Sequence, residues 1–360
     1  MSAATQARRS PLLDTPGAVA AEGPDAGVAW HYGDPHGEQR ALVRGEAVAD
    51  LSHRGVLRLS GPDRLSWLHS ITTQALTGLA PGVSTETLVL SPQGRIEHSL
   101  HLVDDGEALW ITVEPGQVDA LRTWLERMRF MLRVEIADVS ADVAVLGEPS
   151  RDADSPLGTV WVDPWPGATP ANEGGSADTA SYSAVSTLEH PGAERPWREV
   201  LVPRADLLAA VGGRRLAGTW ASEALRVEAW RPRLGLDTDE RSLPHELDWL
   251  RTAVHLHKGC YRGQETVAKV HNLGRPPRRL ALLHLDGSSH DLPAHGDDVV
   301  LGEKRVGVVT TAARHHELGP VALAVLKRSL PVDAELFAVA GSAKGESRPL
   351  AAAQEVVVAP

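Results

Sequence analysis

A single cysteine, Cys260, in a chain of 360 residues means that no intramolecular disulfide can hold this protein together. The fold must therefore depend on apolar cores. Hydrophobic residues make up 42% of the sequence, which is enough for two or three domains with sizeable cores. The thiol itself is kept either because it packs as a small hydrophobe or because it is reactive.

Residues 258–265, which read KGCYRGQE, surround this thiol. The two glycines of the motif permit tight turns and close approach of the backbone. The charge of Lys258 would favour the thiolate, and the run from Gln264 to about Gly274 predicts a short helix whose N-terminus would lower the thiol pKa. We therefore expect Cys260 to be partly exposed at the edge of a pocket. A buried structural cysteine is the alternative.

Apolar periodicity predicts an α+β unit in the first half of the chain. The expected strands lie at residues 56–59, 87–90, 96–102, 108–113 and 133–136, and the expected helices run from 65 to 75 and from 121 to 131. The turn Ser91–Gly94 would join two of these strands as a hairpin. This pattern is typical of two helices packed on a mainly antiparallel sheet.

The remainder of the chain contains an irregular segment and a series of short strands. Residues 149–196 are rich in Pro, Gly, Ser and Ala and have few periodic apolar positions, so they predict a mobile insertion. A strand at 199–202 and helices at about 222–230 and 242–254 follow. Beyond them, short runs separated by turn residues predict a small antiparallel β-barrel; they lie at 280–285, 298–301, 305–310, 322–326 and 335–339.

These patterns divide the chain into three parts. Residues 1–27 lack periodicity and predict a flexible leader. Residues 28–275 form the main domain, with the insertion at about 149–196, and residues 276–360 form the barrel domain.

The KGCYRGQE motif resembles the hallmark of the YgfZ family of folate-binding proteins, which are relatives of the glycine-cleavage aminomethyltransferases (GcvT). The likeness continues through residues 266–275 and includes the segment 224–229, and weaker similarity runs from about residue 30 to the end. It implies an α+β, aminomethyltransferase-like fold, with two ferredoxin-like portions around a folate pocket and a small C-terminal antiparallel barrel. The motif positions are Lys258, Gly259, Cys260, Tyr261, Gly263, Gln264 and Glu265.

The resemblance also implies a function and a set of site residues. It implies an accessory protein that binds tetrahydrofolate, or a one-carbon-substituted folate, and supports assembly or repair of iron–sulfur enzymes, including those that modify tRNA. Cys260 is then the functional thiol. Glu228 matches the glutamate that grips the pterin, because a carboxylate can accept two N–H bonds from an amino-pyrimidine edge. Arg226 and Tyr261 are further folate contacts. An exposed helix glutamate and a surface ion pair are the alternatives for Glu228 and Arg226.

Glu97 and His98 stand where the aminomethyltransferases carry adjacent aspartates. A longer carboxylate and an imidazole cannot keep the same geometry toward the folate, which argues against aminomethyl transfer. A folate-dependent aminomethyltransferase or one-carbon transfer enzyme is therefore the alternative function, so that enzyme status stays open. A third alternative is a binding module in which Cys260 only packs. Glu97 and His98 can equally be ordinary strand residues without a functional role.

Other features bear on metals, partners and location. His255 and His257 would share one face of a strand, but no further ligands have metal-site spacing nearby, so no metal site is predicted. His315 and His316 are expected in a solvated polar loop. The net charge of −11 argues against direct binding to nucleic acid or anionic membranes. We expect a cytoplasmic monomer whose partners are folate and iron–sulfur enzymes or their assembly proteins.

Overall fold

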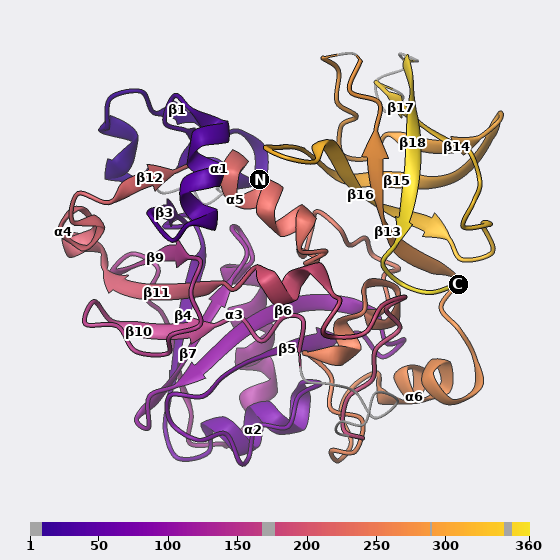
Figure 1. Ribbon diagram of the computed structural model, residues 1–360. Coiled ribbons are helices and arrows are strands. Elements are labelled where there is room, and N and C mark those ends of the chain that lie inside the picture. The colour runs from indigo at the N-terminus through magenta and orange to yellow at the C-terminus, as the bar shows by residue number, and fades with distance from the viewer. Residues whose placement is uncertain (1–8, 168–176, 289, 342–347) are drawn as a thin grey trace, which may run out of the picture.

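Two five-stranded sheets and a closed β-barrel make up most of the computed structural model in the residues that it describes, which are 9–167, 177–288, 290–341 and 348–360. Helix α5 (Thr219–Glu228) lies between the barrel and the two sheets (Figure 1). The predicted fold class, α+β with a C-terminal antiparallel barrel, is confirmed.

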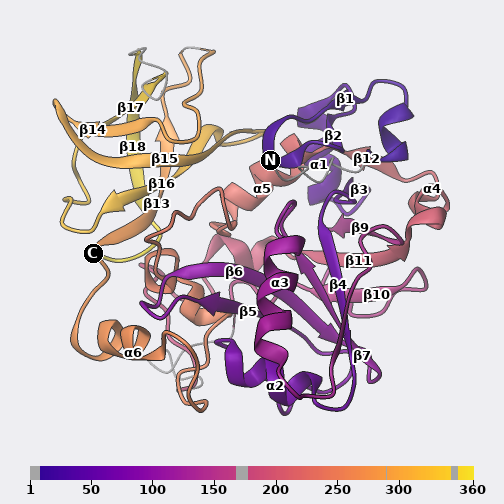
Figure 2. The same ribbon diagram turned by 180° about the vertical axis from the view of Figure 1, so that it is seen from behind.

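The first sheet is antiparallel throughout and has the strand order β5-β6-β7-β4-β8. Its strands are β4 (Gly55–Ser60), β5 (Ser84–Leu90), β6 (Ile96–Asp104), β7 (Ala108–Val113) and β8 (Glu135–Asp138). Helices α2 (Arg64–Ile71) and α3 (Val118–Arg129) pack on one face, which Figure 2 shows from the side of α3. Leu121 and Leu125 of α3 are fully buried there, since residues four apart share one side of a helix.

The second sheet has the order β10-β11-β9-β3-β12 and is antiparallel except for the parallel pair β12–β3. Its strands are β3 (Ala47–Asp50), β9 (Val143–Glu148), β10 (Thr159–Val162), β11 (Arg198–Pro203) and β12 (Arg215–Ala217). Helices α1 (Pro35–Val43) and α4 (Leu207–Val211) accompany it. Helix α1 begins at Asp34, whose carboxylate accepts a hydrogen bond from the backbone N–H of Gly37 at 3.0 Å.

The barrel closes in the order β13-β16-β15-β14-β17-β18, with β18 returning to β13. Its strands are β13 (Arg278–Leu285), β14 (Asp298–Leu301), β15 (Lys304–His315), β16 (Gly319–Lys327), β17 (Leu336–Ala340) and β18 (Arg348–Val356). Helix α6 (Gln264–Leu273) precedes the barrel and lies where the sequence predicted a helix after Gly263.

A central core joins these parts. It contains Leu90 of β5, Val227 of α5 and Trp249, together with Leu282 and Leu323 of the barrel strands. The same continuous apolar cluster therefore packs against the first sheet, α5 and the outside of the barrel.

The N-terminal residues correct one prediction. Instead of a flexible leader up to residue 27, residues 9–27 form short ordered elements, and Leu12, which is 2% exposed, packs in the apolar cluster of the second sheet. The elements are η1 (Pro11–Asp14), β1 (Val19–Ala20), η2 (Gly23–Asp25) and, just beyond, β2 (Ala29–His31). Asp25 fixes the segment, since its carboxylate binds both His53 and Arg233 at 3.0 and 2.6 Å. Residues 1–8 lie outside the described residues.

The helix predicted at 242–254 is also wrong in detail. The structure has two short 3₁₀ turns, η6 (Pro244–Leu247) and η7 (Trp249–Arg251). Asp248 separates them in a left-handed conformation with φ +57°, and its buried carboxylate accepts bonds from the Tyr182 backbone N–H at 2.5 Å and the Ser181 hydroxyl at 2.8 Å. This buried hydrogen bonding outweighs helix propensity there.

The predicted mobile insertion, residues 149–196, is partly regular. Strand β10 pairs with β11, and η4 (Pro191–Glu194) follows later in the segment. Trp165 is 3% exposed, within the central core. The middle of this segment, 168–176, lies outside the described residues.

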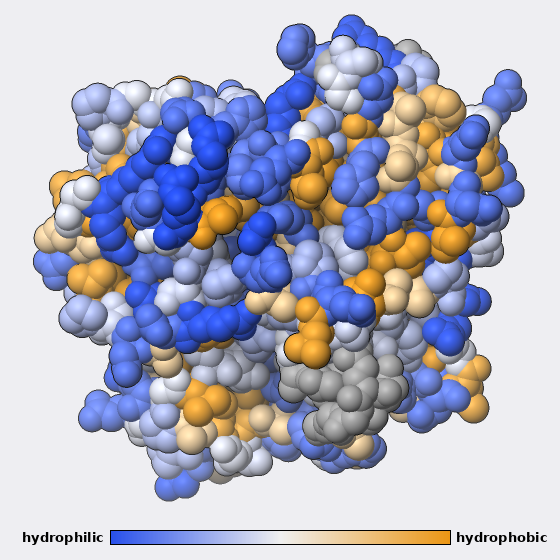
Figure 3. Space-filling model, viewed as in Figure 1, coloured by the Kyte–Doolittle hydropathy of each residue, from blue (hydrophilic) through white to orange (hydrophobic). Residues whose placement is uncertain are grey.

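Within the described residues, none of the helices is both long and apolar enough to cross a membrane. On the face shown in Figure 3, hydrophobic side chains form separate small groups among hydrophilic ones.

Candidate functional site

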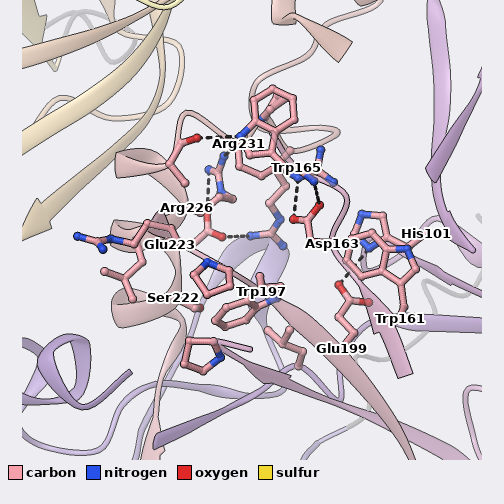
Figure 4. A pocket seen from close by; sticks show the side chains of 18 of the residues that line it. His101, Trp161, Asp163, Trp165, Trp197, Glu199, Ser222, Glu223, Arg226 and Arg231 are labelled. Atoms are coloured by element: carbon pink, nitrogen blue, oxygen red, sulfur yellow. Dashed lines mark hydrogen bonds and ion pairs between the residues drawn. The ribbon is translucent and has the colours of Figure 1, made fainter. Parts of the chain in front are cut away.

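A cavity of about 130 Å³ opens where the two sheets and α5 meet (Figure 4). Indole rings, arginines and carboxylates form much of its wall; they include Arg54, His101, Glu114, Trp161, Asp163, Trp165, Arg195, Trp197, Glu199, Glu223, Arg226, Arg231 and Arg233. Strand β6 supplies His101, β10 and β11 supply Trp161 and Glu199, and α5 supplies Glu223 and Arg226.

One wall of the cavity is flat and aromatic. The rings of Trp161 and His101 stack with centroids 3.8 Å apart and planes only 4° from parallel. The Trp161 indole N–H donates to the Thr85 carbonyl at 2.7 Å, which fixes the ring. Such a wall suits a planar heterocyclic ligand, because aromatic rings favour offset stacking.

Glu199 fixes the position of His101 in this wall. Its carboxylate binds the Arg54 guanidinium, His101 Nδ1 at 3.0 Å and the Thr112 hydroxyl at 2.5 Å. Burial alone would raise the pKa of Glu199, but Arg54 and His101 outweigh burial and lower that pKa to about 2. The carboxylate is therefore ionised and fully bonded at neutral pH.

Arg231 also lines the cavity. Its guanidinium binds Glu86 at 2.7 Å and Asp163 at 3.1 Å, and it lies 5.2 Å from the centre of the Trp165 ring. Burial would lower the pKa of Arg231, but the carboxylates of Asp163 and Glu86 outweigh it and raise the pKa. Burial raises the pKa of Asp163 against the opposing effect of Arg231.

The α5 side of the cavity carries a network of charges. Arg226 binds Glu223 at 2.9 Å and the buried Asp237 at 2.7 Å. Glu223 also binds Arg233 at 3.2 Å, and Arg233 binds Asp25 at 2.6 Å. The N-terminal segment is thereby tied to the cavity through Asp25.

Glu228 of α5 lies outside the described lining of the cavity and binds Arg195, which is part of that lining. Both of its carboxylate oxygens are occupied, because Arg195 Nη2 donates to Oε1 at 2.7 Å and Arg195 Nε donates to Oε2 at 2.5 Å. His315 Nε2 lies 3.2 Å from Oε2. Burial would raise the pKa of Glu228, but these hydrogen bonds outweigh it and lower the pKa to about 2.

His315 corrects another prediction. Instead of lying in a solvated loop, His315 ends β15 with 2% exposure. Its Nδ1 accepts bonds from the backbone N–H groups of Glu317 and Leu318 at 3.2 and 3.1 Å. The imidazole is buried because it connects this turn to Glu228 of α5.

In the KGCYRGQE motif, the lysine and the thiol have different surroundings. Lys258 is buried, and its ammonium donates to backbone carbonyls at the end of α2, namely those of His69, Thr72 and Gln74. Burial lowers the pKa of Lys258 to about 8. The lysine thus stabilises a helix C-terminus. Cys260 is exposed, but it is not part of the described lining of the cavity, so its position at a pocket edge stays a prediction.

The same motif packs tightly against the β5–β6 hairpin. Gly263 has φ +83°, and a Cβ built on it would lie 2.6 Å from the Ser91 carbonyl oxygen. Arg262 reaches across the contact to Glu97 at 2.7 Å. His98, next to Glu97, is buried, and burial lowers its pKa.

Gly263→Ala is expected to destabilise the protein by about 1–3 kcal/mol, because the new Cβ is strained in a left-handed conformation and collides with backbone. Gly259→Ala is the matched control, since a Cβ at Gly259 meets nothing within 4 Å. Urea denaturation of both variants measures the difference. Equal stabilities would contradict the described contact.

The histidine pair before the motif lies near one carboxylate. His255 Nε2 and His257 Nδ1 are 3.7 and 3.4 Å from Asp178. Among the residues with described positions, no group of three or more His, Cys, Asp or Glu side chains is arranged to hold a metal ion.

The structure thus separates the residues that the sequence singled out. Arg226 lines the cavity, whereas the described lining does not include Glu228, Cys260 or Tyr261. Tyr261 is buried in the central core, with the Lys258 ammonium 5.2 Å from its ring centre. Sequence reasoning missed the aromatic wall, although ten of the fifteen aromatic residues are tryptophan and two of them occur four apart, at 161 and 165, in a Pro-rich segment.

Comparisons with known proteins place this geometry in context. Residues 15–152 match the model of the GCVT N-terminal domain family. The chain is 27% identical over 317 residues to "Putative transferase At1g60990, chloroplastic" of Arabidopsis thaliana. This alignment covers 83% of this chain and 69% of that protein. It is 26% identical over 344 residues to the aminomethyltransferase of Nostoc sp., covering 87% and 86% of the two chains.

A solved structure matches nearly the whole chain. The glycine cleavage system aminomethyltransferase T from Bartonella henselae superimposes with a TM-score of 0.70 at 18% identity, covering 97% of this chain and 95% of that one. The chain therefore has an aminomethyltransferase-like fold, and the comparisons support a GcvT-related family for it.

Proposed function

We propose that this protein binds tetrahydrofolate, or a one-carbon-substituted folate, in the cavity between the sheets and α5, and that it supports assembly or repair of iron–sulfur enzymes. The observation that carries the proposal is a flat aromatic wall next to buried carboxylates and arginines, within an aminomethyltransferase-like fold. The YgfZ-like motif supplies the iron–sulfur part, including enzymes that modify tRNA.

The residues of the cavity fit the chemistry of a folate. A pterin is planar and can stack on the His101 ring, which the buried Trp161 ring supports from behind, and its N–H edge needs carboxylate acceptors. When bound, tetrahydrofolate would supply a one-carbon carrier; the side chains of this protein would hold and orient it.

Cys260 is proposed as the thiol of the accessory role. Its exposure leaves it accessible to a client protein, while Lys258 and Gly263 fix its backbone against α2 and the hairpin. We further propose a cytoplasmic monomer, in keeping with a single thiol. Folate and iron–sulfur enzymes or assembly proteins are its proposed partners.

The alternative, a folate-dependent aminomethyltransferase, is favoured by one observation. Asp163 is a buried cavity carboxyl with a raised pKa, as a proton-transfer residue needs. Against it, Glu97 is exposed and paired with Arg262.

The deciding experiment titrates the purified, reduced protein with tetrahydrofolate and with 5-formyl-tetrahydrofolate, following tryptophan fluorescence. Quenching is expected because three indoles line the cavity. Binding of both ligands without turnover of an aminomethyl donor supports the accessory role, and turnover supports the transferase. Absence of binding would refute both.

Glu228→Gln is expected to weaken folate binding by about 1–3 kcal/mol, because a glutamine offers a pterin N–H edge one acceptor oxygen where the proposed anchor Glu228 offers two. Glu46→Gln is the control, since Glu46 is an exposed glutamate in a surface ion pair with Arg44. The dissociation constants from the same titration measure the effect. An unchanged value for Glu228→Gln would assign this glutamate to structure alone.

A further inference from the structure

Glu228 already holds a group with the chemistry of the proposed ligand. Arg195 presents two parallel N–H donors, Nε and Nη2, one to each carboxylate oxygen of Glu228. With His315 also within hydrogen-bond distance of Oε2, the carboxylate has three partners. A carboxylate offers about four acceptor positions, so too few remain for two more N–H bonds.

The guanidinium of Arg195 and the edge of a pterin are chemically alike. The 2-amino-4-oxo-pyrimidine ring of a pterin contains a cyclic guanidine, whose ring N–H and amino group form a donor pair of the same geometry. A side-chain carboxylate binds either fork through two parallel bonds. Arg195 therefore stands in for the pterin on Glu228.

The Arg195 side chain is also positioned so that it can move away from Glu228. It follows η4 in the segment before β11, lines the cavity, and its side chain is 22% exposed, compared with 14% for Glu228. Apart from Glu228, its described hydrogen bond is to the Glu194 carbonyl at 3.2 Å. Rotation of this one side chain would free Oε1 of Glu228 and one acceptor position on Oε2, which keeps its contact with His315.

We infer that Arg195 is a specificity-determining residue that occupies the pterin position on Glu228 until a ligand with a guanidine-like edge displaces it. This inference rests on the proposed function. Arg195 lowers the affinity of ligands that must displace it, and it keeps planar rings without paired N–H donors out of this position, since these cannot compete for Glu228.

The test measures tetrahydrofolate dissociation constants for the full-length wild type, Arg195→Ala, Arg195→Lys, and the double variant Arg195→Ala with Glu228→Gln. Arg195→Ala is expected to bind at least fivefold more tightly than wild type, and Arg195→Lys to fall between them. The double variant is expected to lose this gain. Arg195→Lys keeps the test usable should the alanine variant fail to fold.

Two controls separate competition from general loosening. Arg64→Ala removes an arginine with the same Nε and Nη2 contacts, to Asp104 at 2.7 and 2.8 Å, and Arg64 is not part of the described cavity lining. Its affinity is expected to match wild type. Methylguanidinium, added to Arg195→Ala, is expected to fill the vacated space and weaken folate binding again, with no effect on wild type.

The outcomes distinguish the two proposals. If wild type binds folate but Arg195→Ala binds equally or more weakly, or if methylguanidinium does not compete, the role of Arg195 is refuted and the folate site stands. If folded wild type and Arg195→Ala both fail to bind folate, the proposed function and this inference fail together.

Discussion

Arg231→Met is expected to lower the free energy of unfolding by about 3–5 kcal/mol, because it leaves two buried carboxylates without their cation. Glu86 is fully buried and Asp163 is 9% exposed, and Arg231 is the arginine that pairs with both. Guanidinium denaturation monitored by circular dichroism measures the loss. The cavity should also lose folate affinity, since Arg231 forms part of its wall.

A surface arginine supplies the matched control. Arg133 makes a paired contact with Asp63, at 2.8 Å, but it is 74% exposed. Exposed ion pairs contribute only about 0–1 kcal/mol, so Arg133→Met should be nearly neutral. If both substitutions cost the same, the Glu86–Arg231–Asp163 cluster contributes no more than a surface pair.

Cys260→Ala is expected to abolish restoration of iron–sulfur enzyme activity in cells that lack the protein. Because the side chain is exposed, the substitution should change stability by no more than about 0.5 kcal/mol and leave folate affinity intact. Enzyme activity in complemented cells, with the protein level measured alongside, tests this expectation.

Cys260→Ser separates thiol chemistry from polarity, since serine keeps the size of the side chain but cannot cycle between thiol and oxidised forms. It should fail in the same way as alanine. Full complementation by either variant would exclude a chemical role for Cys260 and leave a binding module. Comparison with Glu228→Gln then shows whether the thiol and the folate site serve one function.

The sequence predicted elements well where the pattern was local. The helix after Gly263, the strands of the first sheet and five of the six barrel strands follow from periodicity and turn residues within short windows, whereas β18 was not predicted. The 3₁₀ turns around Asp248 did not follow, because the break depends on a hydrogen bond from Tyr182, 66 positions earlier.

The site depends even more on distant contacts. The segment before Ala229 marked Glu228 correctly as part of α5, but its partners Arg195 and His315 lie 33 and 87 positions away. Likewise, His101 meets Glu199 across 98 positions, where β6 of one sheet faces β11 of the other. Ion pairs of this kind are set by the tertiary fold, and no spacing rule in one sequence reveals them.

The central core that Leu90, Val227, Leu282 and Leu323 share has a consequence for how the protein unfolds. The barrel strands turn part of their apolar surface outward into this core, so a chain ended at residue 275 would expose it to water. Residue 275 therefore separates two structural units, but these units do not fold independently of each other. Barrel and sheets should melt together in a single cooperative transition, and damage at either end of the chain should reach the central core that joins them.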